Sequence, residues 1–237
     1  MQNNFYNLAI LLFIDTAGEK AIVALSEDSN LLAMETNEQS NTHASFVQVA
    51  IESIVAKANI KMQSIDAVVV TMGPGSYTGL RVGLATAKGI AYALNKPLIG
   101  LSTLALLAKH ASTHPFVEAH KNKLQIFSMI DAKRMEVFGG IYKTDETIVL
   151  PEQAIVLDTA YLEKLLVNGP VLCVGNGATK TATLLTHNQL AFLPSSYSME
   201  DFISLGVRKW DNKSFEDLAY SSPAYLKDFY QPTAGNS

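Results

Sequence analysis

Residues 68–100 read VVVTMGPGSYTGLRVGLATAKGIAYALNKPLIG and contain the pattern of a strand, a tight turn, a long helix and a second strand. The β-branched run at 68–71 is typical of a strand that is buried on both faces. Pro74-Gly75 suits the centre of a type II turn, in which the second residue needs a positive φ. Ser76 can accept a hydrogen bond from a free amide group and so cap a helix. We therefore expect a helix over residues 77–94.

The expected helix carries small residues in two rows, at a spacing of four along each row. Three glycines within a helix cost about 1 kcal/mol each relative to alanine, so close packing must offset them. Another helix could approach such a smooth face unusually closely. That packing occurs either within this chain or against a partner subunit. The first row is Gly79, Gly83, Ala87 and Ala91, and the second is Ala85, Gly89 and Ala93.

The glycine turn resembles a phosphate-binding turn but lacks the residues that bind phosphate. A P-loop needs a Gly-Lys pair followed by Ser or Thr, and here Leu80 follows Gly79. A dinucleotide-binding turn needs glycine at its sixth position, which Thr78 occupies. An acidic residue should also follow to bind a ribose, and none occurs between Asp66 and Glu118. The sequence therefore argues against nucleotide binding by this turn.

The length and composition are those of an ordinary globular protein. A chain of 237 residues suffices for one large domain or two small ones. Its net charge of −4 gives no overall attraction to nucleic acid or to an anionic membrane. The single cysteine, Cys173, forms no disulfide within the chain, which fits a reducing compartment. The apolar run 8–14 is too short to cross a bilayer, so we expect a cytoplasmic protein.

Two parts of the chain show the same order of expected elements. In the first, the expected order is three strands, a helix, a strand, a helix, a strand and a helix. These elements are expected at Leu8–Ile14, Ala21–Leu25, Leu31–Glu35, Ser45–Asn59, Val68–Thr71, Tyr77–Leu94, Leu98–Gly100 and from Ser102. In the second, the expected order is three strands, a helix, a strand and a helix. These elements are expected at Leu124–Ile130, Val137–Tyr142, Thr147–Leu150, Ala160–Val167, Val171–Val174 and after Gly177. Such repetition predicts two similar lobes with a cleft between them.

The predicted fold class is α/β, with two RNase H-like or actin-like (ASKHA) lobes, each strand-strand-strand-helix-strand-helix. We place the first lobe at residues 1–105 and a smaller second lobe at 106–217, and we expect residues 218–237 to pack back on the first lobe. In such folds, aspartates at the ends of first strands can hold a metal ion and a nucleotide phosphate in the cleft. The corresponding residues, which predict a vestigial nucleotide cleft with weak binding or none, are Asp15, Thr16, Gly73, Gly75 and Asp131.

In several of its motifs, the chain resembles the bacterial TsaB (YeaZ) family. The segments that carry the resemblance are FIDT at 13–16, GPGSYTGLR at 73–81, KGIA at 88–91, PLIGLSTL at 97–104 and IDAKRMEV at 130–137. The family usually has His-Ser after the third strand, and this chain has His43-Ala44, so any role of that serine is absent.

The resemblance implies a non-catalytic subunit of the complex that makes threonylcarbamoyladenosine in tRNAs reading codons that begin with A. It implies a TsaD-type catalytic partner of the same fold, a TsaE-type ATPase in the full complex, a homodimer when the chain is alone, and tRNA contact only through the complex. The TsaD-type relative carries a metal-binding His-x-x-x-His where this chain has Thr103 and Leu107.

The partner interface is expected on the two first-lobe helices. Under this hypothesis, a bulky residue at Gly83 blocks assembly and leaves the isolated chain folded. The residues expected at the interface are Val47, Ile51, Ile54, Gly79, Leu80, Gly83, Leu84, Ala87, Ile90 and Ala91.

Two enzymatic alternatives remain open. A metal-dependent, glycopeptidase-like hydrolase would hold its metal with Asp15 and Asp131, and a small-molecule kinase would bind ATP in the cleft. His110 and His114 could share one helical face, but two imidazoles without a third ligand make a poor zinc site. We therefore expect no metal and no catalytic residue in this chain.

Overall fold

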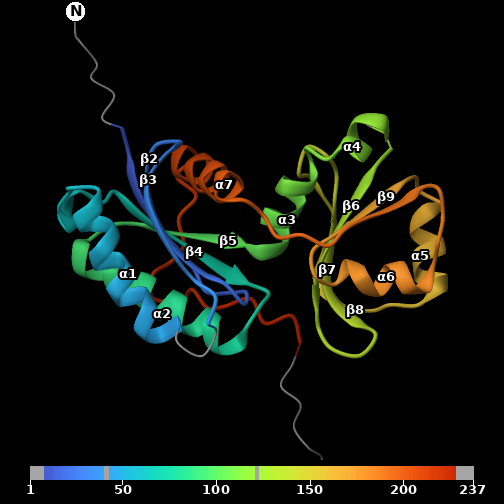
Figure 1. Cartoon of the computed structure of the whole chain (residues 1–237), viewed down its shortest axis with the longest axis horizontal. Helices are drawn as coiled ribbons and strands as arrows, with labels where there is room; N and C mark the ends of the chain where they lie inside the picture. The colour runs from blue at the N-terminus through green and yellow to red at the C-terminus, as the bar shows by residue number, and fades with distance from the viewer. Residues whose placement is uncertain (1–7, 40–42, 121–122, 228–237) are drawn as a thin grey trace, which may run out of the picture.

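The computed structural model describes residues 8–39, 43–120 and 123–227 of the chain. It consists of two lobes, each built on a five-stranded mixed sheet with helices packed against it (Figure 1). No helix within these residues is both long enough and apolar enough to cross a membrane.

The two sheets have the same topology. In each, the first strand is antiparallel to the second and parallel to the fourth, and the third and fifth strands form the two edges. The first sheet runs β3 (Asn30–Asn37), β2 (Ala21–Glu27), β1 (Ile10–Asp15), β4 (Ala67–Gly73), β5 (Leu98–Ser102). The second runs β8 (Ile148–Val156), β7 (Glu136–Tyr142), β6 (Gln125–Asp131), β9 (Val171–Val174), β10 (Leu190–Leu193). This repetition confirms the predicted two-lobe α/β fold.

Side-chain alternation along β1 divides the first lobe into two cores. Leu12 and Ile14 face the layer formed by α1 (His43–Lys57) and α2 (Tyr77–Leu94). Leu11 and Phe13 face the opposite layer, which α7 (Met199–Asp211) covers. All four side chains are fully buried.

The last helix of each lobe packs on the sheet of the other lobe. α3 (Thr103–Ala111) follows β5 of the first sheet, yet its Leu104 and Leu107 pack with Ile126 of the second sheet. α7 follows β10 of the second sheet, yet its Phe202 lies edge to face on Phe13, with ring centroids 5.1 Å apart. Figure 1 shows α3 between the two lobes and α7 on the first lobe. The lobe boundaries stay predictions, but α7 packs on the first sheet although it falls within 106–217.

The remaining helices of the described chain are short. They are α4 (Pro115–His120), α5 (Thr159–Leu166) and α6 (Ala178–Leu184), with a 3-10 turn at Met62–Ser64. α5 and α6 cover the outer face of the second sheet, where their apolar side chains join Phe127 and Cys173 in the core.

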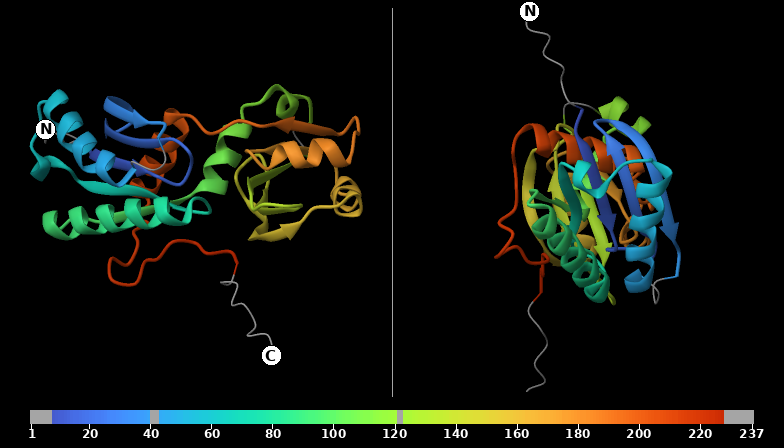
Figure 2. Two further views of the ribbon diagram at one scale, coloured as in Figure 1. Left: turned by 60° about the horizontal axis from the view of Figure 1, so that its bottom comes forward. Right: turned by 90° about the vertical axis from the view of Figure 1, so that its left-hand side faces the viewer.

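The described end of the chain, residues 218–227, is here called the strap. It has no helix or strand and runs along α2 toward the second lobe (Figure 2). Leu218 packs in the first-lobe core, Leu226 packs in the core that α3 forms with the second sheet, and Lys227 pairs with Glu136 on β7. Residues 228–237 of the predicted C-terminal segment lie outside the described residues.

Most of the elements expected from the sequence are present, with boundaries shifted by a few residues. The sequence pattern missed α4, β10 and α7, although the buried residues of α7, Phe202, Ile203, Leu205 and Gly206, recur at helical spacing. Two local predictions were wrong. The glycine with positive φ is Gly73 (φ 104°), not Gly75, and α3 ends at Ala111, so His114 does not lie on the same helix as His110.

Candidate functional site

A cleft of about 920 Å³ separates the lobes. The predicted site residues Asp15 and Gly75 line it from the first lobe, and Asp131 lines it from the second. Thr103 and Leu107 of α3 form part of its floor. Thr16 and Gly73 do not line the cleft, because both are buried behind the loops that do.

Asp15 is buried at the end of β1 and its carboxylate is bound by three donors of its own chain. Oδ1 accepts the Thr71 hydroxyl at 2.7 Å and the Ala17 N–H at 2.9 Å. Oδ2 accepts the Tyr197 hydroxyl. Burial raises the pKa of Asp15 above its ordinary value, although the three hydrogen bonds act in the opposite direction. Burial and the nearby Asp15 also raise the pKa of Tyr197, so the phenol stays a donor.

The glycine turn packs directly on the loop after β1. The Ser76 N–H donates to the Ala17 carbonyl at 2.7 Å, and the Thr16 hydroxyl donates to the Gly79 carbonyl at 2.7 Å. A Cβ at Gly75 would lie 2.4 Å from the Ala17 oxygen, which explains the glycine. Backbone amides at a helix start are what a phosphate would bind, but here the Ser76 amide is already bound within the chain.

Asp131 ends β6 at the position that corresponds to Asp15, but its surroundings differ. Its Oδ1 accepts the Lys180 ammonium at 2.7 Å and the Lys133 N–H at 2.6 Å. The hydrogen bond with Lys180 is the main cause of its lowered pKa. Both aspartates predicted for the cleft are therefore engaged by neighbouring groups.

The sequence did not reveal the side chains that bind these aspartates, which are Thr71, Tyr197 and Lys180. Tyr197 lies 182 residues from Asp15, and Lys180 lies 49 residues from Asp131. Neither sits in a recognisable motif, so only the tertiary structure could reveal them. Across the described ranges, no group of three or more His, Cys, Asp or Glu side chains is placed to hold a metal ion.

His110 contributes to the contact between α3 and α7, the two helices that each pack on the sheet of the other lobe. Its Nδ1 lies 2.8 Å from the Asp201 carboxylate of α7. Asp201 also takes part in the capping box at the start of α7. The imidazole is therefore a neighbour of a structural carboxylate.

The first small-residue row of α2 is part of the chain's own core. Ala87 and Ala91 are fully buried, and a Cβ at Gly83 would lie 2.3 Å from the Thr16 hydroxyl oxygen. At Gly79 it would lie 2.0 Å from the Thr16 carbonyl oxygen. Gly83→Leu would therefore disrupt the isolated chain, which corrects the expectation that it would not. The other predicted interface residues that pack inside the chain are Val47, Ile51, Ile54, Leu80 and Leu84.

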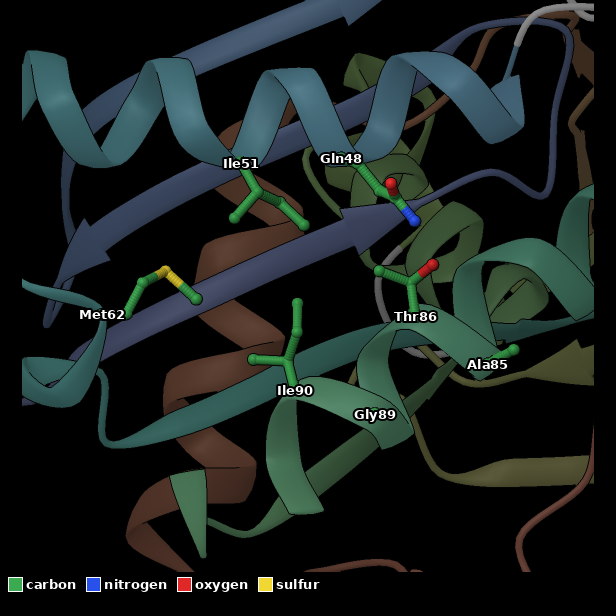
Figure 3. Close-up of a pocket in the computed structure, with 7 residues that line it drawn as sticks. All are labelled: Gln48, Ile51, Met62, Ala85, Thr86, Gly89 and Ile90. Atoms are coloured by element: carbon green, nitrogen blue, oxygen red, sulfur yellow. The ribbon is translucent and has the colours of Figure 1, made fainter. Parts of the chain in front are cut away.

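The second row of α2 faces outward. Gly89 has no atom within 4 Å of the position a Cβ would take, and Ala85 and Ala93 are exposed. Beside this row an open groove of about 370 Å³ lies between α1 and α2, and we call it the α1/α2 groove. Figure 3 shows side chains of both helices and of the 3-10 turn bordering it. Its lining residues are Gln48, Ile51, Met62, Ala85, Thr86, Gly89 and Ile90.

Comparison with solved structures places the fold. YeaZ from Pseudomonas aeruginosa superposes with a TM-score of 0.75 at 21% identity, covering 92% of this chain and all of that one. The inorganic polyphosphate/ATP-glucomannokinase from Arthrobacter sp. superposes with a TM-score of 0.51 at 10% identity, covering 86% and 99%. Together with the repeated lobes, these similarities show a two-lobed, actin-like fold of the ASKHA type.

Sequence comparison narrows the class to one family. A family model described as TsaD, tRNA N6-adenosine threonylcarbamoyltransferase, matches residues 30–233. The tRNA threonylcarbamoyladenosine biosynthesis protein TsaB of Bacillus subtilis is 30% identical over 170 residues, 70% of each chain. TsaB of Escherichia coli is 26% identical over 229 residues, 92% of this chain and 94% of that protein. The chain belongs to the TsaB (YeaZ) family, within the wider group that the threonylcarbamoyltransferase model describes.

Proposed function

We propose that this chain is a non-catalytic subunit of a tRNA threonylcarbamoyladenosine-forming complex and that it acts by binding a TsaD-type catalytic subunit. The family supports the pathway, because the relatives carry that name. The observation that carries the non-catalytic part is the state of the two cleft aspartates. Tyr197 binds Asp15 and Lys180 binds Asp131, so each carboxylate is held by its own chain.

The floor of the cleft supports the same proposal. By the resemblance, Thr103 and Leu107 occupy the positions of the catalytic relative's metal-binding histidines, and both line the cleft here. Neither a threonine methyl and hydroxyl nor a leucine side chain replaces an imidazole as a zinc or iron ligand. The hydrolase and kinase alternatives have no comparable support, since each would need the aspartates free to bind metal or metal-nucleotide.

The docking surface of the proposal is the α1/α2 groove with the exposed row of α2. The small residues Ala85, Gly89 and Ala93 allow a partner helix to approach the α2 backbone closely. The partner is a protein of the same fold, whose matching helices would complete a four-helix contact. A stable contact of this kind buries on the order of 1,200–2,000 Å² in total. A second copy of the chain would occupy the same surface when the partner is absent.

The wider assignment follows from the same family. We propose that the complex includes a TsaE-type ATPase, that it modifies the adenosine beside the anticodon of tRNAs reading codons that begin with A, and that this chain meets tRNA only within the complex. The proposal includes no cofactor for this chain and at most weak nucleotide binding in the cleft.

Gly89→Leu tests the docking surface. The side chain points into open space, so the isolated chain should keep its fold and stability, while the added leucine fills the α1/α2 groove. We expect loss of complex formation with the catalytic subunit by sedimentation, and loss of threonylcarbamoyl transfer in the reconstituted system. Glu163→Leu on the exposed face of α5 is the matched control and should assemble normally. Normal assembly of Gly89→Leu, or transfer activity by the purified chain alone, would contradict the proposal.

A further inference from the structure

The strap is fastened to α2 by a lysine. The Lys88 ammonium donates to the carbonyl of Ala219 at 3.2 Å and to that of Ser221 at 3.1 Å. A backbone hydrogen bond continues the attachment, because the Ala224 N–H donates to the Met72 carbonyl at 2.8 Å. The strap is therefore bound to both α2 and β4.

An arginine fastens the strap at a second point, near the start of α2. Arg81 Nε donates to the Tyr225 hydroxyl at 2.9 Å, and its Cζ lies 4.0 Å from the centre of the Tyr77 ring. The two tyrosine rings are 5.4 Å apart. Stacking of a guanidinium on an aromatic ring adds a favourable electrostatic contact to the hydrogen bond.

Helix geometry places the strap opposite the α1/α2 groove. Successive residues of an α-helix are rotated by about 100°. Lys88 and Arg81 therefore lie on one flank of α2, and the groove residues Thr86 and Ile90 lie toward the other. The exposed Gly89 lies between the two flanks. The view of Figure 2 in which the bottom of the molecule comes forward shows the strap running beside α2.

Two large aromatic side chains are exposed, one on the strap and one on α2. Tyr220 of the strap is 86% exposed and Tyr92 of α2 is 80% exposed. Tyr220 sits between the two residues whose carbonyls bind Lys88, so the lysine fixes its backbone. Tyrosine is enriched at the energetically dominant positions of protein interfaces.

We infer that the strap extends the docking surface beyond the exposed row of α2. In this arrangement Tyr220 contacts the catalytic subunit that is seated on the α1/α2 groove. This inference rests on the proposed function and adds an element to it. A helix pair seated on α1 and α2 reaches the strap, because only the exposed ridge of α2 separates the groove from it. Lys88 is a positioning residue, since it acts by holding the strap.

The test uses the full chain and the purified catalytic subunit. Tyr220→Ser should weaken the complex about tenfold or more in an affinity titration, as expected for an interface anchor. Val167→Ser is the matched control, because Val167 is 85% exposed on the second lobe, and its affinity should be unchanged. Lys88→Met should raise amide hydrogen exchange at residues 219–224 and weaken the complex, while circular dichroism of the isolated chain stays the same.

The outcomes separate this inference from the proposed function. If Gly89→Leu blocks the complex and Tyr220→Ser binds like the wild type, the strap is not part of the interface and the docking proposal stands. If neither change affects binding, both proposals fail. If Tyr220→Ser weakens only self-association of the chain, the strap contacts a second copy and the inference is overturned.

Discussion

Asp15 and Asp131 are aspartates at equivalent strand ends, and their surroundings shift their pKa values in opposite directions. Asp15 is 4% exposed, and the loss of water raises its pKa more than its hydrogen bonds lower it. Asp131 is exposed and pairs with Lys180, which lowers its pKa. Strand position alone could not assign a role to either carboxylate.

Asp15→Asn tests the state of the buried carboxylate. The folded pKa of Asp15 lies above its ordinary value of 3.8, so the folded chain binds the proton more tightly than the unfolded chain. Stability is therefore lost as the pH rises from about the unfolded value through the folded pKa. We expect Asp15→Asn to be at least as stable as the wild type at pH 7, with a difference that shrinks as the pH falls toward 4. Denaturant unfolding across this pH range measures it.

Asp131→Asn is the control with the opposite sign. Its lowered pKa contributes stability above the unfolded pKa, and that stability is lost as the pH falls through the folded pKa. The variant should lose a little stability at pH 7, since the carboxylate is half-exposed and its pair with Lys180 is screened by solvent.

For the buried residue, a large loss of stability at pH 7 in Asp15→Asn would show that the Asp15 carboxylate is charged and favourable there.

At the scale of the element, α2 shows how one sequence pattern serves two faces. Both of its small-residue rows have the same spacing, yet one meets Thr16 at core distances and the other meets solvent. The helix begins at Ser76, whose hydroxyl accepts the Gly79 N–H, and ends at Asn95 in a left-handed conformation. The Ser76 cap was predicted from the sequence, but the Asn95 cap and the orientation of the helix were not.

Substituting alanine for glycine in each row separates the two faces. Gly83→Ala forces a Cβ toward the Thr16 hydroxyl, and overpacking of this kind costs about 1–3 kcal/mol, partly offset by about 1 kcal/mol of helix propensity. Gly89→Ala meets no atom and should stabilise the chain by about 0.5–1 kcal/mol. Free energies of unfolding from urea titrations compare them. Equal effects at the two positions would contradict the assigned orientation of α2.

At the scale of the whole molecule, the exchange of α3 and α7 makes the two lobes depend on each other. Each lobe completes its core with a helix that follows the other lobe's sheet. Polar contacts reinforce this arrangement: Glu146 of the second lobe pairs with Lys109 of α3 and Arg208 of α7, and Glu152 accepts the Ser102 hydroxyl. We therefore expect the lobes to unfold together.

The single tryptophan and the single cysteine report on the two lobes separately. Trp210 lies on α7 against the first sheet, and Cys173 is buried in β9 of the second. Burial raises the pKa of Cys173 to about 12, so a thiol reagent reacts only after the second lobe opens. Tryptophan fluorescence and thiol labelling should give the same denaturation midpoint. Phe202→Ala should lower both equally, by the equivalent of about 3–5 kcal/mol, because the ring packs on Phe13.

Val167→Ala, at an exposed position of the second lobe, should leave both midpoints unchanged. Separate midpoints for fluorescence and labelling, or a shift of the fluorescence signal alone in Phe202→Ala, would show that the lobes are independent.

By itself, the sequence determined the elements and their repetition. Continuous apolar strands, caps and glycine turns are local features, so most strands and helices, their repeated order up to α6, and the resemblance to one family followed from residues close together in the chain. Asp15 and Asp131 could be placed at a cleft because the ends of first strands meet there in folds of this class.

Only the tertiary structure decided which face of α2 is core, which side chains bind the cleft aspartates, and where α3, α7 and the strap pack. Each of these depends on contacts between residues far apart in the sequence, such as Tyr197 with Asp15 or Lys88 with Ala219. A local pattern carries no information on such contacts, because a row of small residues packs equally well on its own chain and on a partner.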